Sequence, residues 1–395
     1  VSGNDRIGNY NSYSTYGTSS YKASYAIDGS NTSAYAGFRP ATLGNEDVTW
    51  ETTETINLGI DANMLDNHLA VSVDVWQRNT SDMLFQEPIP QVMGVASAPF
   101  VNIGEMKNTG IDFELGYNNS ALDGKLTYNA SLTLSHYKNE IVQLSGDPDR
   151  TIDAASERQM TYTRYANGTA FPEFFGYVVE GIFQTQAEAD AHAPYGTSDY
   201  NAPGHFKYQD VDGSGVIDAD DRTFIGSPHP DLTGGLNIDL GYGAFDLNMF
   251  FYGSLGNEMV NYVTRWIDYG MFNGGLSKDA LYESWGSPYL ANNADATLPM
   301  LDQSDISQQP STAFVEDASF LRMKNLRLGY TLPQSILDKA QIKRLSVYAQ
   351  VSNVFTITKY SGLDPEVRSS GSNMGLDMGA WPTPRQIMFG VTLGL

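Results

Sequence analysis

A strict two-residue alternation of apolar and polar side chains runs through residues 125–135. Apolar residues occupy every second position from Leu126 to Leu134, and Thr, Asn and Ser occupy the positions between them. A period of two predicts a β-strand with one apolar and one polar face. The length of the segment is close to the roughly 9–11 residues that a tilted strand needs to cross a bilayer.

The same alternation recurs along the chain. It is present in residues 69–76, 111–118, 236–242, 345–352 and 387–395. The pattern predicts an all-β chain of roughly ten strands, which we interpret as the wall of a transmembrane, antiparallel outer-membrane β-barrel. The alternative is a large soluble β-sandwich, which also has one buried and one solvated sheet face.

Aromatic residues favour the membrane barrel. They gather near the ends of the predicted strands, where barrels carry interfacial girdles. These residues are Tyr117, Tyr128, Tyr137, Tyr242, Phe250, Phe251, Tyr252, Tyr330 and Phe389.

The connections between strands alternate in length. Residues 241–244 form a short connection, whereas residues 136–232 and 256–316 are far longer than typical connections. Short turns on one side and long extracellular loops on the other are typical of outer-membrane barrels. Turn signals occur at 65–67 and 118–119, and a short helix is predicted near 277–285.

Composition excludes several classes of protein. The chain has 395 residues and is 41% hydrophobic, without a run of about eighteen apolar residues, which disfavours a helical membrane protein. It contains no Cys, so disulfides and Cys-ligated metals are excluded. The formal net charge of −23 argues against nucleic acid as a partner.

One segment has the spacing of a calcium-binding loop. Its oxygen ligands would come from positions 1, 3, 5, 7, 9 and 12, with Gly215 at the sharp turn. The predicted ligands are Asp210, Asp212, Ser214, the Val216 carbonyl, Asp218 and Asp221. Ca²⁺ is favoured over Mg²⁺ as the bound ion, and its role would be structural. The alternative is an Asp- and Gly-rich surface turn without an ion.

No catalytic motif is present. The five His residues have no mutual metal-ligand spacing, and no nucleophile elbow or phosphate-binding loop occurs. Glu173 and Glu180 are the nearest approach to a glycosidase pair. We therefore expect a protein that is not an enzyme.

Aromatic residues in the predicted loops are candidates for substrate binding. Their rings can stack on sugar faces or on peptide side chains. The candidates are Trp266, Tyr269, Phe272, Tyr282, Trp285 and, beyond the long loops, Trp381. The alternative is that these rings pack the loops onto themselves.

Several segments resemble the C-terminal part of the SusC/RagA family of TonB-dependent outer-membrane transporters from Bacteroidetes. Each match is weak alone, but together they follow one another in order over nearly the whole chain. The segments are 7–10, 50–54, 57–59, 82–84, 88–90, 102–105, 108–110, 176–177, 181–184, 210–221, 225–228, 362–366 and 384–385.

The resemblance implies a barrel of about 22 strands, closed by an N-terminal plug and driven by the TonB complex. It also implies a SusD-like surface lipoprotein as a partner. Residues 1–395 lack the plug and would form the later part of the barrel wall, with its extracellular loops. We expect the first part as a separate or cleaved chain, because open strand edges in lipid are prohibitive.

The expected function is import of oligosaccharides across the bacterial outer membrane, by TonB-dependent uptake. Oligopeptide import by the same architecture is the first alternative. A soluble secreted glycan-binding β-protein and an outer-membrane enzyme are alternatives from other classes.

Overall fold

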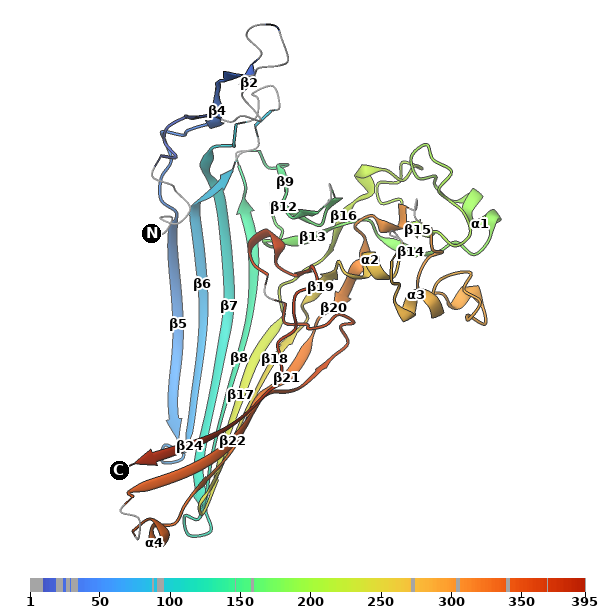
Figure 1. Ribbon diagram of the computed structural model, residues 1–395. Coiled ribbons are helices and arrows are strands. Elements are labelled where there is room, and N and C mark those ends of the chain that lie inside the picture. The colour runs from blue at the N-terminus through green and yellow to red at the C-terminus, as the bar shows by residue number, and fades with distance from the viewer. Residues whose placement is uncertain are drawn as a thin grey trace.

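The computed structural model describes most of the chain. The described residues are 10–18, 24–25, 29, 35–86, 89–90, 96–145, 147–157, 160–270, 274–302, 306–338, 342–367 and 369–394. They form a tall curved sheet and a lobe of folded loops that projects from one end of the sheet (Figure 1).

The curved sheet contains nine strands. In chain order they are β5 (Thr52–Met64), β6 (Leu69–Gln86), β7 (Phe100–Ala121), β8 (Leu126–Gln143), β17 (Leu232–Tyr242), β18 (Phe245–Leu255), β21 (Phe320–Thr331), β22 (Arg344–Thr358) and β24 (Gln386–Gly394). Each strand pairs antiparallel with the next one in this order. The predicted antiparallel meander is therefore confirmed, with nine strands instead of roughly ten.

Register places the apolar positions of all nine strands on one face, the outer face. On β8, Leu132 lies opposite Leu115 of β7 and Leu236 of β17. The same row continues from Leu236 to Phe251 of β18. Outer-face side chains such as Ile60 on β5 remain exposed, at 72%. An exposed, continuous apolar face suits contact with lipid.

The inner face carries a network of polar side chains. Asn248 donates to Asp239 over 2.7 Å, and Asn129 of the neighbouring strand donates to the same carboxylate. Farther along the sheet, the Trp76 indole N–H donates to Asp112 over 2.8 Å. These bonds cross between strands, so the polar half of the alternation links the strands to one another.

The short turns lie at one end of the sheet. Gly243, with φ +59°, stands in the two-residue turn between β17 and β18, as predicted. Three consecutive residues with positive φ, Leu65, Asp66 and Asn67, form the turn predicted there. The turn predicted at residues 118–119 is wrong, because β7 continues to Ala121 and the chain reverses at 122–125.

Aromatic pairs on the outer face lie near both ends of the wall. Near the short turns, the rings of Phe245 and Tyr330 lie 4.8 Å apart. Near the loops, Phe251 and Phe355 lie 6.5 Å apart. Three of the aromatics assigned to girdles lie on the inner face instead, because they occupy polar positions of the register: Tyr137, Phe250 and Tyr252.

The long connections fold into the lobe. Their strands and helices are β9 (Thr151–Asp153), β10 (Ser156–Glu157), β11 (Met160–Thr161), β12 (Thr163–Ala166), β13 (Glu173–Gly176), β14 (Val179–Ile182), α1 (Gln186–Ala191), β15 (Phe206–Tyr208), η2 (Ala219–Asp221), β16 (Thr223–Gly226), β19 (Glu258–Asn261), α2 (Thr264–Ile267), α3 (Lys278–Tyr282), η3 (Asn293–Asp295), η4 (Ile306–Gln308), η5 (Thr312–Phe314), β20 (Val315–Asp317), η7 (Gly371–Asn373) and β23 (Leu376–Asp377). The helix α3 confirms the helix predicted near 277–285. The predicted loop at 136–232 begins later than expected, because β8 extends to Gln143.

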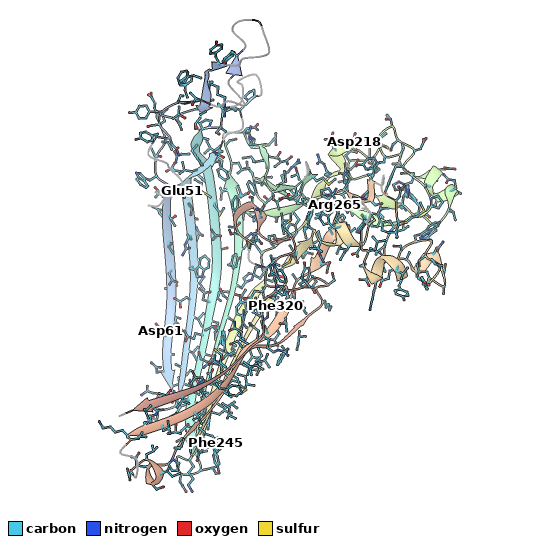
Figure 2. All side chains as sticks on the ribbon, viewed as in Figure 1. Glu51, Asp61, Asp218, Phe245, Arg265 and Phe320 are labelled. Atoms are coloured by element: carbon cyan, nitrogen blue, oxygen red, sulfur yellow. The ribbon has the colours of Figure 1, made fainter. Side chains whose placement is uncertain are left out.

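The lobe has its own apolar core. Phe174, Tyr208, Val260 and Phe314 are buried in it and come from loops far apart in the sequence. β19 pairs antiparallel with β20 and parallel with β23, so the loop after β18 and the last loop of the chain share one small sheet. Figure 2 shows Asp218 and Arg265 in this lobe and Phe245 at the opposite end of the wall.

The remaining elements flank the sheet. They are β1 (Thr15–Thr18), β2 (Ser24–Tyr25), β3 (Tyr35–Ala36) and β4 (Phe38–Thr42) above β5, and α4 (Gln334–Leu337) beside a short turn. Among the helices in the described part of the chain, none has the length and the apolar stretch that a membrane span needs.

The two faces of the wall should respond differently to an added positive charge. Ile238→Arg, at the middle of the outer face of β17, is expected to destabilise the protein by about 2–4 kcal/mol, because lipid cannot solvate the guanidinium. The measurement is the denaturant midpoint of the purified protein in lipid vesicles. Ser131→Arg, on the inner face opposite Asn237, is the control, and an equal loss in both variants would contradict the assignment of the faces.

Candidate functional site: the inner wall and the outer loops

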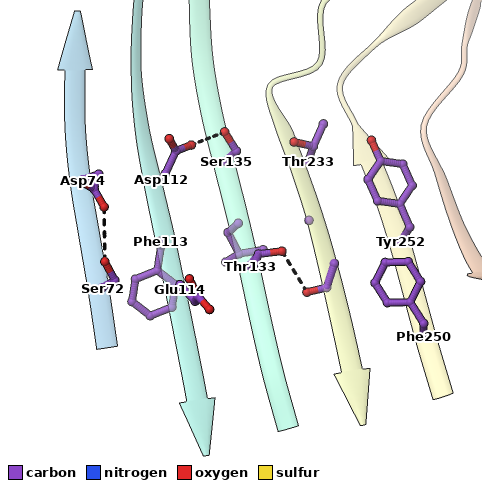
Figure 3. Close-up of a pocket in the computed structure, with 13 residues that line it drawn as sticks. Ser72, Asp74, Asp112, Phe113, Glu114, Thr133, Ser135, Thr233, Phe250 and Tyr252 are labelled. Atoms are coloured by element: carbon purple, nitrogen blue, oxygen red, sulfur yellow. Dashed lines mark hydrogen bonds between the residues drawn. The ribbon is translucent and has the colours of Figure 1, made fainter. Parts of the chain in front are cut away.

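A hollow of about 420 Å³ lies on the inner face of the wall, across β6, β7, β8, β17 and β18 (Figure 3). Its lining combines carboxylates, hydroxyls and aromatic rings. The lining side chains include Ser72, Asp74, Asp112, Glu114, Thr133, Ser135, Thr233, Phe250 and Tyr252. Acceptors and flat rings on one surface can contact a polar cargo.

The carboxylates of this hollow also hold the wall together. Asp112 accepts hydrogen bonds from Trp76 and from Ser135, so it joins three strands. Asp74 accepts from Asn57 over 3.0 Å. Glu114 is exposed on the inner face. Sequence reasoning missed this surface, although its signal was the polar half of the alternation that predicted the strands.

A second inner hollow lies nearer the short turns. It has a volume of about 550 Å³ and is lined by Asn129, Asp239, Asp246, Asn248 and Arg327, among others. Arg327 forms an ion pair with Asp246 over 2.6 Å. Two of the charged side chains here therefore neutralise each other, whereas Glu114 is exposed on the inner face.

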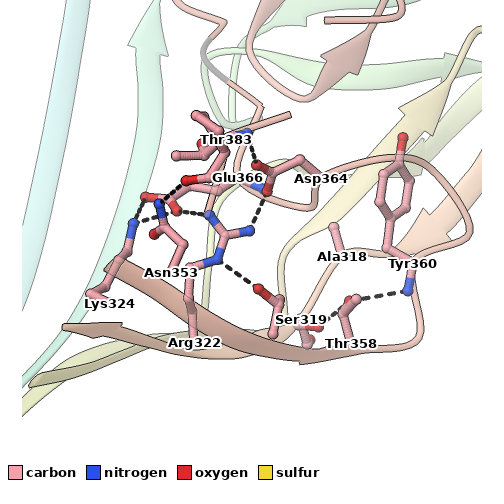
Figure 4. Close-up of polar contacts among 12 residues, drawn as sticks. Ala318, Ser319, Arg322, Lys324, Asn353, Thr358, Tyr360, Asp364, Glu366 and Thr383 are labelled. Carbon is pink, nitrogen blue, oxygen red and sulfur yellow. Dashed lines mark hydrogen bonds and ion pairs between the residues drawn. The ribbon is translucent and has the colours of Figure 1, made fainter. Parts of the chain in front are cut away.

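The last loop, between β22 and β24, is held against the inner wall by buried ion pairs (Figure 4). Arg322, only 4% exposed, donates to Asp364 and, over 2.7 Å, to Glu366. Lys324 also pairs with Glu366. Burial alone would raise the pKa of Asp364, but the hydrogen bonds from Arg322 and from the backbone N–H groups of Thr383 and Glu366 outweigh it and lower that pKa.

Two anchored carboxylates flank Trp381. Asp364 accepts from the N–H of Thr383 over 2.9 Å, after the indole in sequence. Before it, Asp377 accepts from the N–H of Gly379 over 2.9 Å and from the Tyr360 hydroxyl over 2.7 Å. The indole itself is 96% exposed. A rigid backbone thus presents an aromatic ring to its surroundings, which lowers the entropy cost of any contact it makes.

The other predicted binding aromatics differ in exposure. Tyr282 is half exposed, and its ring lies 5.1 Å from that of Tyr289. Trp285 is partly buried, and its indole N–H donates to Gln184 over 3.1 Å. Tyr269 is 4% exposed and packs against Phe314.

Trp266 is partly buried and packs against the lobe core, where its ring lies 5.7 Å from that of Tyr262. Phe272 lies outside the described residues. For Tyr269 and Trp266 the structure therefore shows the packing role, and it leaves Tyr282 and Trp381 as the exposed candidates.

The calcium-like loop brings three of its predicted ligands together. Carboxylate oxygens of Asp210, Asp212 and Asp221 lie within 4.8 Å of one another. Asp221 is fully buried and accepts from the N–H groups of Val211 and Asp218, each over 2.7 Å. The backbone N–H of Ser214 holds the pKa of Asp212 below its usual value.

The remaining predicted ligands are arranged differently. The Ser214 hydroxyl donates to the Val216 carbonyl over 3.0 Å. The Asp218 carboxylate accepts from the N–H of Asp220 and so caps η2 instead of joining the three carboxylates. Hard oxygen donors of this kind suit Ca²⁺ or Mg²⁺.

Glu173 and Glu180 lie on different strands of the lobe. Burial raises the pKa of Glu173, which belongs to β13. Glu180 belongs to β14, where it faces Lys207 over 3.4 Å. The two carboxylates therefore stand in different surroundings.

The fold and its two faces define a part of an outer-membrane β-barrel. Residues 6–354 match the family described as TonB dependent receptor-like, beta-barrel. The chain belongs to this family of receptors. The expected SusC/RagA resemblance and outer-membrane location are confirmed, and the soluble β-sandwich is set aside.

Known proteins similar to the chain are considerably longer. TonB-dependent receptor P3 of Formosa agariphila is 34% identical over 365 residues, which are 89% of this chain and 35% of that protein. TonB-dependent receptor SusC of Bacteroides thetaiotaomicron is 29% identical over 364 residues, 91% of this chain and 33% of that protein. The chain thus spans about a third of the length of the curated relatives it matches.

Among solved structures, one described as the RagAB peptide transporter resembles this fold closely. Its TM-score is 0.76 at 27% identity, and the match covers 99% of this chain and 39% of that one. The relatives are receptors and transporters, in agreement with the expectation that the chain is not an enzyme.

Removing the Asp364 carboxylate should free the last loop. Asp364→Ala is expected to lower the free energy of local unfolding of this loop by about 1–3 kcal/mol, because the buried Arg322 loses an acceptor. The measurement is hydrogen exchange of the Thr383 amide, with Asp295→Ala, at an exposed position, as the control. Unchanged protection of Thr383 would contradict this role.

The hydrogen bonds that Asp364 accepts should be sensitive to acid. Because the pKa of Asp364 is lowered in the folded state, its stabilisation is fully present above the unfolded value of about 3.9 and is lost as the pH falls through the folded pKa. The protection factor of the Thr383 amide, measured by hydrogen exchange, should therefore fall only below about pH 4.

Proposed function

We propose that this chain is part of a TonB-dependent importer that carries nutrients across the outer membrane. The observation that carries the proposal is the nine-stranded sheet with an apolar outer face and a polar inner face, in a chain of the TonB-dependent receptor family. Such a wall separates lipid from a polar interior through which cargo can pass.

The proposal includes three partners. The first is the preceding plug and barrel portion of the same transporter, which would pair with the free edges of β5 and β24. The second is the TonB complex, acting through that portion. The third is a SusD-like surface lipoprotein above the lobe; the similarity to the RagAB transporter supports a two-protein assembly.

We propose oligosaccharides as the cargo. Support comes from the exposed rings of Trp381 and Tyr282, which lie in the connections between wall strands, and from the acceptor-rich inner hollow. Oligopeptides are the second candidate, because a solved structure that this fold resembles at a TM-score of 0.76 is described as a peptide transporter. Both cargoes would use the same wall.

The test is uptake by cells that lack the transporter gene and carry it again on a plasmid, with labelled oligosaccharides and labelled peptides as separate probes. Trp381→Ala is expected to raise the half-saturating cargo concentration about 2- to 10-fold, because a stacking contact contributes about 0.5–1.5 kcal/mol. Uptake restricted to peptides would support the second candidate.

Two control variants sharpen this result. Trp381→Phe keeps a flat ring and should retain most of the uptake. Leu363→Ala changes another exposed side chain of the same loop, 72% exposed, and should leave uptake unchanged. Equal uptake by the wild type and Trp381→Ala would remove Trp381 from the site, and normal uptake without the gene would refute the import function.

We also propose that the loop at 210–221 holds a structural Ca²⁺, with Mg²⁺ as the less favoured ion. Asp210, Asp212 and Asp221 would supply carboxylate oxygens, and Val216 its carbonyl. The support is the carboxylate cluster and the calcium-loop spacing. The ion would neutralise part of the acidic charge and stiffen the loop.

A double variant tests the ion. Asp210→Ala with Asp212→Ala should abolish bound calcium, measured by elemental mass spectrometry after dialysis, and should remove the rise in Tm that calcium produces. Asp220→Ala changes an exposed carboxylate of the same loop and is the matched control. The same calcium content in the wild type and the double variant would refute the site.

A further inference from the structure

A groove crosses the outer face of the wall at its centre. It has a volume of about 550 Å³ and extends over β8, β17, β18 and β21, away from the edge strands β5 and β24. Its sides are leucines, among them Leu134, Leu236 and Leu321, and its lining is almost wholly apolar. Because this groove belongs to the outer face, it opens toward the bilayer and not toward the cargo.

Two glycines form the floor of the groove. Gly234 of β17 lies directly opposite Gly253 of β18 in the register. At position 234 a Cβ would meet Leu134 Cδ2 at 2.7 Å and Thr133 O at 2.9 Å, so packing demands a glycine.

At position 253 a Cβ would come no closer than 3.3 Å, to Phe320 O. Packing therefore demands glycine less strongly at this position. Glycine inside a strand lowers stability and often marks a place that a ligand approaches closely. The missing side chain of Gly253 keeps the groove open.

The sheet is irregular beside these glycines. The pairing of β18 with β21 shifts between Phe250 and Phe251, and that of β21 with β22 shifts between Met323 and Asn325. Such bulges bend a strand and increase its local twist. These bulges lie beside the groove, on a face that is otherwise covered by bulky side chains.

The length of the groove matches one leaflet of a bilayer. On β17 its lining runs from Leu232 to Ile238, which is about 20 Å along an antiparallel strand. At a tilt of about 45° this length projects to about 14 Å, close to half of the hydrocarbon core of about 30 Å. Leu232 begins β17 on the side of the long loops, so the groove lies in the outer leaflet.

We propose that this groove seats one acyl chain of an outer-leaflet lipid. The chemistry it recognises is a flexible hydrocarbon chain, and the surrounding bilayer supplies it. Lys138 and Asp231 both lie beyond the loop end of the groove, on β8 and just before β17, so the rim carries both signs of charge and selects no single head group. The inference rests on the outer-membrane location of the wall and holds for either cargo.

The test uses the complete transporter in vesicles of phosphatidylethanolamine. The probe is phosphatidylethanolamine with a photoreactive diazirine on one acyl chain, and the labelled peptides are identified by mass spectrometry. We expect labelling to concentrate on peptides that contain Leu236, Leu255 or Leu321, and this excess over the other outer-face peptides should stay constant as the fraction of probe rises. Labelling spread evenly over the outer face would overturn the proposal.

Two matched variants fill space on the outer face. Gly253→Leu places a side chain in the groove and should reduce labelling of these peptides at least five-fold. Ala349→Leu enlarges a side chain on the same face outside the groove and should leave the labelling unchanged. Undiminished labelling in Gly253→Leu would overturn the proposal. The distribution of labelling over the outer face of the wild type decides the matter even where a variant fails to fold.

Discussion

The need to pair every backbone N–H and C=O group inside the membrane governs this structure. Hydrocarbon offers no hydrogen bonds, so each strand of the wall must find its partners in its neighbours. The nine strands meet this demand in chain order, each antiparallel to the next. Antiparallel pairing then carries the two-residue alternation of one strand onto the next, and one apolar face and one polar face result.

This dependence explains what the sequence could predict. Residues 126–134 alternate so regularly that the strand and its two faces followed from periodicity, and the turn at Gly243 followed from its chemistry. Periodicity fails where neighbouring residues are alike. Phe250, Phe251 and Tyr252 are all aromatic, so only the register shows that Phe251 alone of the three faces outward.

The candidate site was harder to predict, because its contacts join distant parts of the chain. Trp381 and Tyr269 look equivalent as sequence, yet one is 96% exposed and the other 4%. The difference arises from the lobe core around Phe314 and from the carboxylates beside Trp381, and neither leaves a local pattern. The loop at 210–221 could be recognised because its ligands lie within twelve consecutive residues, although Asp218 took a capping role that spacing cannot reveal.

The parallel pairing of β19 with β23 joins two connections that are separate in sequence. Val260 pairs with Leu376, and Asn261 donates to Ser361, so the loop after β18 and the last loop share a hydrogen-bonded seam. Arg322 fastens the same last loop to the wall. The two connections and the wall at β21 are thereby joined by backbone pairing, side-chain hydrogen bonds and an ion pair, so a displacement of either connection would strain the contacts of the other.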